Sequence, residues 1–88
     1  MKEGLWISVK ERLPVYDGRY LVTTRGIYTT SVDICDFTND LKSRVDDETE
    51  RKRGWYIYNS GWGYVSVDYV TAWQELPEPY KENSNNDI

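Results

Sequence analysis

The alternation of apolar and polar residues in the first third of the chain predicts a β-hairpin. Residues 19–24 read as a strand, Arg25-Gly26 as its turn and residues 27–37 as the return strand. Side chains alternate between the two faces of a strand. We expect the core face of the return strand to hold Tyr28, Thr30, Val32 and Ile34. The opposite, wetter face then holds Thr29, Ser31, Asp33 and Cys35.

A second, strongly aromatic hairpin is predicted further along the chain. Residues 55–58 form one strand, Asn59-Ser60-Gly61 a short loop, and residues 62–69 the partner strand. If Trp55 and Ile57 face inward, alternation turns their neighbours outward. The exposed face of this hairpin would then hold Tyr56, Tyr58, Trp62 and Tyr64.

The segments that flank the hairpins carry weaker signals. Ser8 and Glu11 have the spacing of a helical capping box, but Pro14 limits this segment to about one helical turn. Residues 70–73 continue in extended form or make a separate short edge strand. The two prolines that follow end regular structure. The polar residues 80–88 are predicted to be disordered.

Residues 38–54 form a charged insert between the hairpins. Its only apolar residues are Leu41 and Val45, while opposite charges are spaced four residues apart, acid first. Residues 38–53 therefore form either a helix or a mobile charged loop. The basic run 51–53 could serve as a contact site, although such runs are more often solvated surface.

These elements predict one compact domain over residues 1–79. The fold class is mainly β, or α+β if the insert is helical. We expect a small antiparallel sheet of four to five strands, built from two hairpins, with a helical turn near the N-terminus. The pattern leaves open whether the sheet closes into a barrel. An open sheet would leave a free edge, through which a homodimer could form.

Composition excludes several kinds of chemistry. The chain of 88 residues has no histidine and one cysteine. A Ser-His-Asp or Cys-His site, a histidine-ligated metal, an internal disulfide and a multi-cysteine metal site are therefore ruled out within this chain. We expect no enzymatic activity, no cofactor and no metal. Aromatic residues make up 15% of the chain, and most of these rings should form its core.

Charge and hydropathy limit the classes of partner and the cellular location that we expect for this protein. Eleven basic against fifteen acidic residues give a net charge of −4, which argues against binding nucleic acid through its phosphates. The chain has no apolar run of about 18 residues that could span a membrane, and its start does not resemble a secretory signal. A single cysteine fits a reducing compartment. We expect a cytoplasmic protein.

The aromatic face is the most suggestive candidate site. Exposed Tyr and Trp side chains favour protein recognition. The rings could instead pair across the strands and only stabilise the sheet, or be covered by residues 38–54. A small-ligand alternative stacks a nucleotide between the rings. Its phosphate contacts would come from Arg25, Arg51 and Arg53.

Three other features carry weaker signals for chemistry. Asp33, Asp36 and Asp68 lack the spacing of a calcium loop and read as exposed strand-end acids. Cys35 has no histidine to activate it and reads as a small half-buried residue. Gly61-Trp62-Gly63 is not a phosphate loop, and it suits a turn or bulge that aims the ring outward.

The two ends of the chain resemble a known family. The opening Trp6-Ile7-Ser8-Val9, with Arg12-Leu13-Pro14, and the close at residues 70–79 are similar to a bacterial and phage-associated family catalogued as domain of unknown function 551. That family opens W-I-x-V-x-x-R-L-P and closes near V-T-H-W-M-P-L-P-E-P. This chain departs from the pattern at its close, where Ala72 replaces the usual histidine and Gln74 and Glu75 replace Met and Pro.

The resemblance implies a small accessory protein of phages and prophages, with no activity that can be transferred. It leads us to expect a protein that binds and modulates, for example inhibits, a host or phage protein in the bacterial cytoplasm. A defence or regulatory factor is the kind of partner we expect. An acidic mimic of nucleic acid is a weaker alternative, because −4 is a modest charge.

Overall fold

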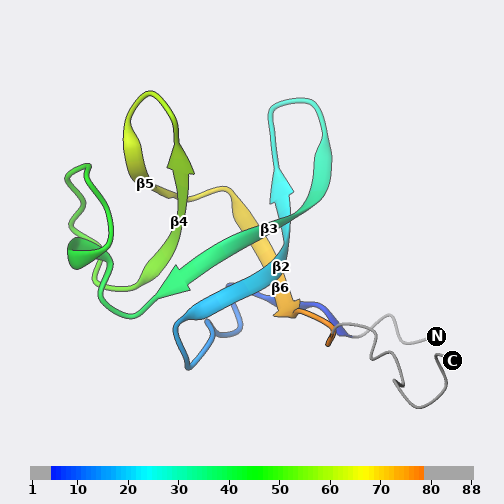
Figure 1. Cartoon of the computed structure of the whole chain (residues 1–88). Coiled ribbons are helices and arrows are strands. Elements are labelled where there is room, and N and C mark those ends of the chain that lie inside the picture. The colour runs from blue at the N-terminus through cyan, green and yellow to red at the C-terminus, as the bar shows by residue number, and fades with distance from the viewer. Residues whose placement is uncertain (1–4, 79–88) are drawn as a thin grey trace, which may run out of the picture.

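The computed structural model describes residues 5–78, which form an open six-stranded antiparallel sheet (Figure 1). Its strands are β1 (Ile7–Ser8), β2 (Gly18–Arg25), β3 (Thr30–Thr38), β4 (Gly54–Asn59), β5 (Gly63–Val67) and β6 (Val70–Glu75). They lie in the order β1-β6-β2-β3-β4-β5. The mainly β prediction is confirmed, with six strands instead of four to five. The sheet is open, not a barrel.

The last strand lies inside the sheet. β6 pairs with β2 from Tyr20 opposite Glu75 to Thr24 opposite Val70, and with β1 through Ile7 opposite Trp73. The alternative that made this segment an edge strand is therefore wrong. Local patterning does not encode the partner of a strand that lies more than forty residues away, so β6 could be recognised as extended but not placed.

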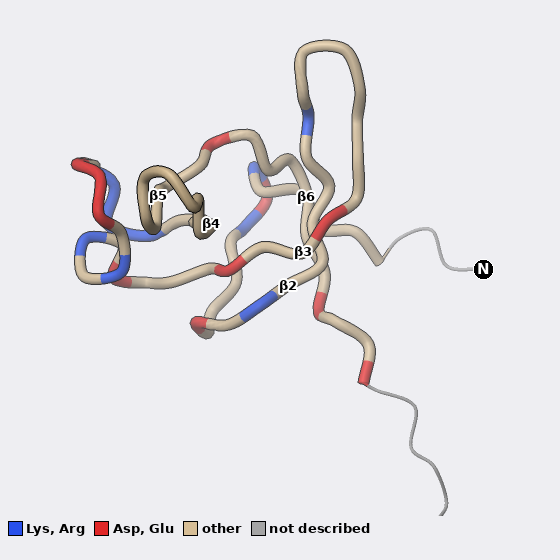
Figure 2. The backbone as a smooth tube through the Cα atoms, turned by 45° about the horizontal axis from the view of Figure 1, so that its top comes forward, with Lys and Arg blue, Asp and Glu red and all other residues tan. Residues whose placement is uncertain are grey.

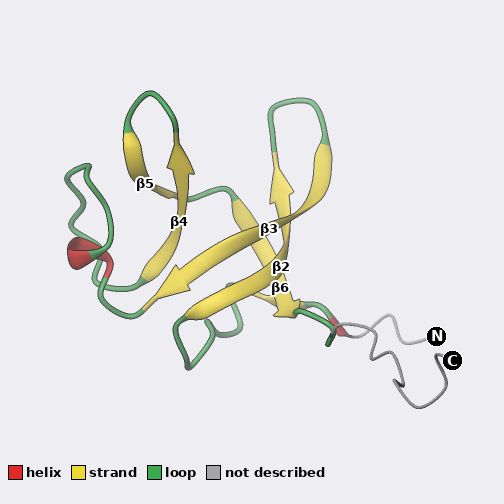
Figure 3. Cartoon of the chain, in the orientation of Figure 1, coloured by secondary structure: helices red, strands yellow, loops and turns green. Residues whose placement is uncertain are grey.

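Within the part of the chain that the structure describes, the helical content is confined to short turns (Figure 3). Near the N-terminus, the amides of Glu11 and Arg12 donate to the Ser8 carbonyl at 2.9 and 3.2 Å, so the predicted single turn is present. Between the hairpins, only Leu41–Ser43 form a 3₁₀ helix (η2), and the rest is loop. Among residues 5–78 no helix is long and apolar enough to cross a bilayer. The disorder predicted for residues 80–88 lies outside the described residues.

The core covers one face of the sheet. The Tyr20 ring meets the rings of Trp55 and Trp73 edge-on, with centroids 6.0 and 5.3 Å apart. The indole Nε1 of Trp73 donates to the Arg12 carbonyl at 2.9 Å, which ties the N-terminal segment to this face. Aromatic edge contacts and apolar burial together stabilise it. The buried cluster comprises Tyr20, Val22, Cys35, Phe37, Trp55, Val67, Val70 and Trp73.

The predicted core face of β3 is wrong. Val32 and Ile34 are 61% and 50% exposed, while Cys35 and Phe37 on the opposite face are buried. Tyr28 is 93% exposed and lies in a 26–29 loop that the Gly26 amide closes on the Thr29 carbonyl at 2.8 Å. The outer half of the β2–β3 hairpin extends past the strands that cover the core, so residues 25–34 are exposed on both faces. The alternation was correct, but it does not say which face meets the core.

Candidate functional site

Three tyrosines gather on the open face of the sheet, opposite the core. Because Trp55 is buried and Ile57 packs against the core, the intervening side chains of β4 point outward. Tyr58 lies opposite Tyr64 in the β4–β5 ladder, and their rings stand 5.1 Å apart. The rings of Tyr56 and Tyr64 are 6.0 Å apart. We call Tyr56, Tyr58 and Tyr64 the tyrosine face.

The rings of the tyrosine face remain accessible. Tyr58 is 62% exposed and Tyr64 43%, while Tyr56 is half-buried. Trp62 is 77% exposed and stands at the turn of the β4–β5 hairpin, where its amide donates to the Asn59 carbonyl at 3.0 Å. The structure therefore pairs the three tyrosines and places Trp62 at the tip beyond them.

The charged insert lies along the outer edge of β5 and leaves the tyrosine face open. The Tyr64 amide donates to Asp46 Oδ2 at 2.8 Å, and the Asp46 amide donates back to the Tyr64 carbonyl at 2.7 Å. The Ser66 amide donates to Asp47 Oδ1 at 3.1 Å. Acidic and basic residues interleave along this loop (Figure 2). The loop thus occupies hydrogen-bonding groups of an edge strand.

Two arginines border the tyrosine face on its inner side. The Arg19 Nε donates to Asp36 Oδ1 at 3.1 Å, and this hydrogen bond raises the pKa of the guanidinium. Arg44 lies 3.9 Å from an Asp17 carboxylate oxygen. Burial, and then the nearby Asp36 charge, raise the pKa of Tyr56. A shallow hollow of about 430 Å³ is lined by Arg19, Asp36, Ser43, Arg44, Tyr56 and Tyr64.

The arginines suggested for phosphate contacts lie elsewhere. Arg53 donates to Asn39 Oδ1 at 2.8 Å and sits over the Phe37 ring, 5.7 Å from its centroid, so it supports the fold. Arg51 reaches the Val67 carbonyl at 3.5 Å, and Arg25 ends β2 in the other hairpin. Sequence reasoning missed Arg19 and Arg44. The pairing register of the first hairpin, which sets Arg19 opposite Asp36, is the signal that would have found Arg19.

Cys35 is not placed for nucleophilic chemistry. Its thiol is buried, not half-buried as predicted, and donates to the Tyr56 carbonyl at 3.4 Å. Burial raises its pKa to about 12, so the thiolate is scarce at neutral pH. Two of the acidic residues that the sequence analysis considered have different partners. Asp36 pairs with Arg19, and Asp33 accepts the amide of its neighbour Ile34 at 2.8 Å.

The fold and this surface define a small β protein whose sheet packs a core on one face and exposes aromatic rings on the other. The chain belongs to the family described as Protein of unknown function (DUF551), whose model matches residues 5–81. No curated protein and no solved structure matches it.

The two ends that carried the family resemblance meet in the structure. Ile7 pairs with Trp73, whose indole bonds to the carbonyl of Arg12, and Pro14 is fully buried. These motif residues therefore anchor the sheet. Ala72 lies opposite Thr23 and Ser8, on the same side of the sheet as the tyrosine face.

Proposed function

We propose that this protein is a non-enzymatic module that binds a partner protein through the tyrosine face and Trp62. The observation that carries the proposal is a set of mutually packed tyrosines that stays accessible on an open sheet face. Tyr and Trp dominate the energetic centres of protein interfaces because they bury large areas with few rotatable bonds.

These rings do not contribute to the buried cluster. The core already takes its aromatic rings from Tyr20, Phe37, Trp55 and Trp73 on the opposite face. Cross-strand pairing of the three tyrosines stabilises the hairpin, yet it leaves more than half of the Tyr58 side chain in water. A contiguous exposed aromatic surface of this kind supports recognition.

The proposed partner is a host or phage protein in the bacterial cytoplasm, such as a defence or regulatory factor, which the module modulates or inhibits. The phage setting rests on the resemblance of the chain ends to proteins of that origin. The net charge of −4 favours a partner with a basic surface, because complementary charge speeds association.

A quantitative pull-down from bacterial lysate tests this function. The full chain should capture a stoichiometric protein, and the Tyr58→Ala/Tyr64→Ala double variant should lose it. Tyr16→Ala is the matched control, because Tyr16 is 77% exposed but lies in the turn before β2. Capture that survives in a folded double variant, judged by circular dichroism, would contradict the proposed face.

A nucleotide ligand is the second candidate, and the hollow beside the tyrosine face favours it. Arg19 and Arg44 there could contact phosphates while Tyr56 or Tyr64 stacks on a base. In a thermal-shift panel, a nucleotide that binds should raise the melting temperature of the protein by mass action. Arg44→Ala should remove that rise. A panel without any shift counts against this candidate.

A further inference from the structure

β3 is an edge strand along its outer half. Residues 36–38 pair with β4, with Asp36 opposite Tyr56, whereas residues 30–35 pair with β2 alone. On the other side, residues 57–59 of β4 pair only with β5. The two hairpins diverge from this point in the sheet (Figure 3). We call the space between residues 30–35 and 57–59 the fork.

One hydrogen bond fixes which backbone groups of β3 point into the fork. The Arg25 amide at the end of β2 donates to the Tyr69 carbonyl at 3.0 Å, away from β3. Backbone groups alternate in direction along a strand, so residue 24 and its partner Ser31 face each other across the β2–β3 ladder. The N–H and C=O groups that face the fork are therefore those of Thr30, Val32 and Ile34.

The side chain of Asp33 supports this direction. Its Oδ1 accepts the Ile34 amide at 2.8 Å, which an amide engaged with β2 would not require. In the same way, Asp46 and Asp47 accept the outward amides of β5. The loop that carries Asp46 and Asp47 thus occupies the β5 edge, while among residues 5–78 the fork edge of β3 has only the Asp33 carboxylate of its own strand.

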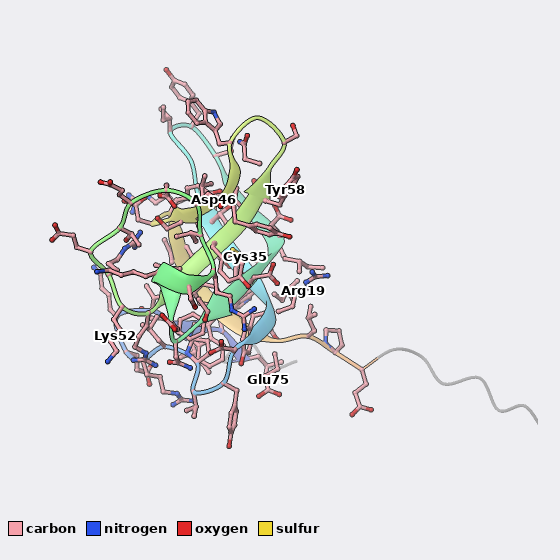
Figure 4. All side chains as sticks on the ribbon, turned by 60° about the vertical axis from the view of Figure 1, so that its left-hand side comes forward. Arg19, Cys35, Asp46, Lys52, Tyr58 and Glu75 are labelled. Carbon is pink, nitrogen blue, oxygen red and sulfur yellow. The ribbon has the colours of Figure 1, made fainter. Side chains whose placement is uncertain are left out.

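The fork has a closed floor and apolar walls on the tyrosine side. The Cys35 thiol donates to the Tyr56 carbonyl where β3 and β4 separate. In the view of Figure 4, Cys35 lies between Tyr58 and Arg19, although its side chain belongs to the opposite, core face of the sheet. Exposed Val32 and Ile34 flank it on β3. A hollow of about 380 Å³ is lined by Arg19, Ile34, Cys35, Asp36, Tyr56, Ile57 and Tyr58.

The opposite side of the fork is acidic. Asp33 projects there, on the same face of β3 as Cys35. Burial raises the pKa of Tyr69, and the negative charges of Asp33 and Asp68 raise it further. A strand in the fork would therefore meet apolar side chains on one face and carboxylates on the other.

We propose that the fork binds an extended segment of a partner protein, which adds a strand to β3 and alternates apolar with Lys or Arg side chains. Its apolar residues would pack on Val32, Ile34 and Tyr58, and a basic residue would pair with Asp33. A backbone carbonyl of the segment replaces the Asp33 carboxylate as the acceptor of the Ile34 amide. The inference rests on the proposed protein-binding function and names the kind of segment that is bound.

A synthetic peptide tests the proposal directly. The probe is a capped peptide of about seven residues that alternates Val and Lys. Its controls are the same length alternating Val and Glu, and the Val/Lys peptide N-methylated on alternate residues. Amide NMR spectra of the full chain should show shifts confined to residues 30–35 and 56–58 with Val/Lys, and much weaker ones with either control. No shift up to about 1 mM peptide, or shifts centred on β5, would overturn the proposal.

Two substitutions on β3 sharpen the test. Val32→Pro removes an amide that faces the fork and should be tolerated at an edge, so the folded variant should lose at least tenfold in peptide affinity. Val32→Thr keeps that amide and is the matched control. Asp33→Lys should reverse the preference from Val/Lys to Val/Glu. Equal binding by folded Val32→Pro, or an unchanged preference in Asp33→Lys, would refute the fork.

The pull-down separates this inference from the proposed function. A lysate partner that is lost by Tyr58→Ala/Tyr64→Ala but fully kept by Val32→Pro would leave the tyrosine face standing and refute the fork. A partner that is kept by Tyr58→Ala/Tyr64→Ala but lost by Val32→Pro would refute the tyrosine face and the Tyr58 contact, and would support strand addition to β3. A partner kept by both folded variants would refute both.

Discussion

Asp17 joins the turn before β2 to the segment that follows β3. Its Oδ2 accepts the Thr38 hydroxyl at 2.7 Å, and its Oδ1 accepts the Asn39 amide at 2.8 Å. The hydrogen bond from Thr38, followed by that from the Asn39 backbone, lowers the pKa of this carboxyl. Thr38 is fully buried, so its hydroxyl depends on this acceptor.

Asp17 should make stability depend on acid pH. Its pKa is lower in the folded than in the unfolded chain, so its stabilisation is complete above the unfolded value near pH 4 and is lost as pH falls through the folded value. Asp17→Asn should cost on the order of 1 kcal/mol at pH 7 after solvent screening, and much less at pH 2. Urea unfolding at both pH values measures this. An equal cost at both would contradict the assignment.

Cys35 should resist alkylation in the folded protein. Its thiol is buried and its pKa is raised to about 12, so few thiolates are available to react. We expect iodoacetamide at pH 8 to modify the native chain far more slowly than the urea-unfolded chain, as read by mass spectrometry. Comparable rates would show that the fold opens easily at this strand.

Gly63 is required by its backbone angle and by its neighbour. Its φ of +85° lies in the left-handed region, and an added Cβ would collide with the Asp46 carboxylate. Gly63→Ala should destabilise the protein by about 1–2 kcal/mol in urea unfolding. Gly61→Ala is the control, because a Cβ there meets only ordinary contacts, and an equal loss in both would contradict the argument.

At the scale of elements, the insert stabilises β5 through its aspartates. Asp46→Ala removes the acceptor of the Tyr64 amide. Hydrogen exchange at Tyr64 should then accelerate, while amides within the β2–β6 ladder keep their protection. Asp40→Ala is a suitable control, because Asp40 is exposed in the same loop and contributes only backbone groups to the hydrogen bonds described. Unchanged exchange at Tyr64 would show that the loop does not hold this edge.

The β4–β5 hairpin was the element that the sequence predicted best. Trp55 and Ile57 face inward and Tyr56 and Tyr58 outward, as alternation indicated, because large inward side chains on both strands fix the face. The β2–β3 hairpin was also predicted, but with the wrong face toward the core. Val32 and Ile34 are apolar, as core residues are, yet they lie in the part of the hairpin that extends past the core. Within the candidate site, the three tyrosines could be predicted from the local alternation of side chains. The bordering arginines required the register and the loop path, which are long-range properties.

On the scale of the whole molecule, the two faces of the sheet should differ sharply in their tolerance of substitution. Trp73→Ala removes a buried ring and should cost about 3–5 kcal/mol, a large share of the roughly 4–13 kcal/mol expected for a chain of this length. Tyr58→Ala on the open face should cost about 1 kcal/mol or less. Thermal unfolding of both variants measures the contrast. Comparable losses would mean that the open face is part of the core.

The position of β6 between β1 and β2 has a consequence for synthesis on the ribosome. β2 is complete at Arg25, but its partner begins only at Val70. At ordinary rates of translation, that interval lasts roughly 2 to 9 seconds. For most of this time, once β3 is complete at Thr38, the nascent chain carries a finished hairpin with a bare β2 edge and unburied aromatic rings. The risk of misassembly is therefore concentrated in those seconds, before β6 covers the edge of β2.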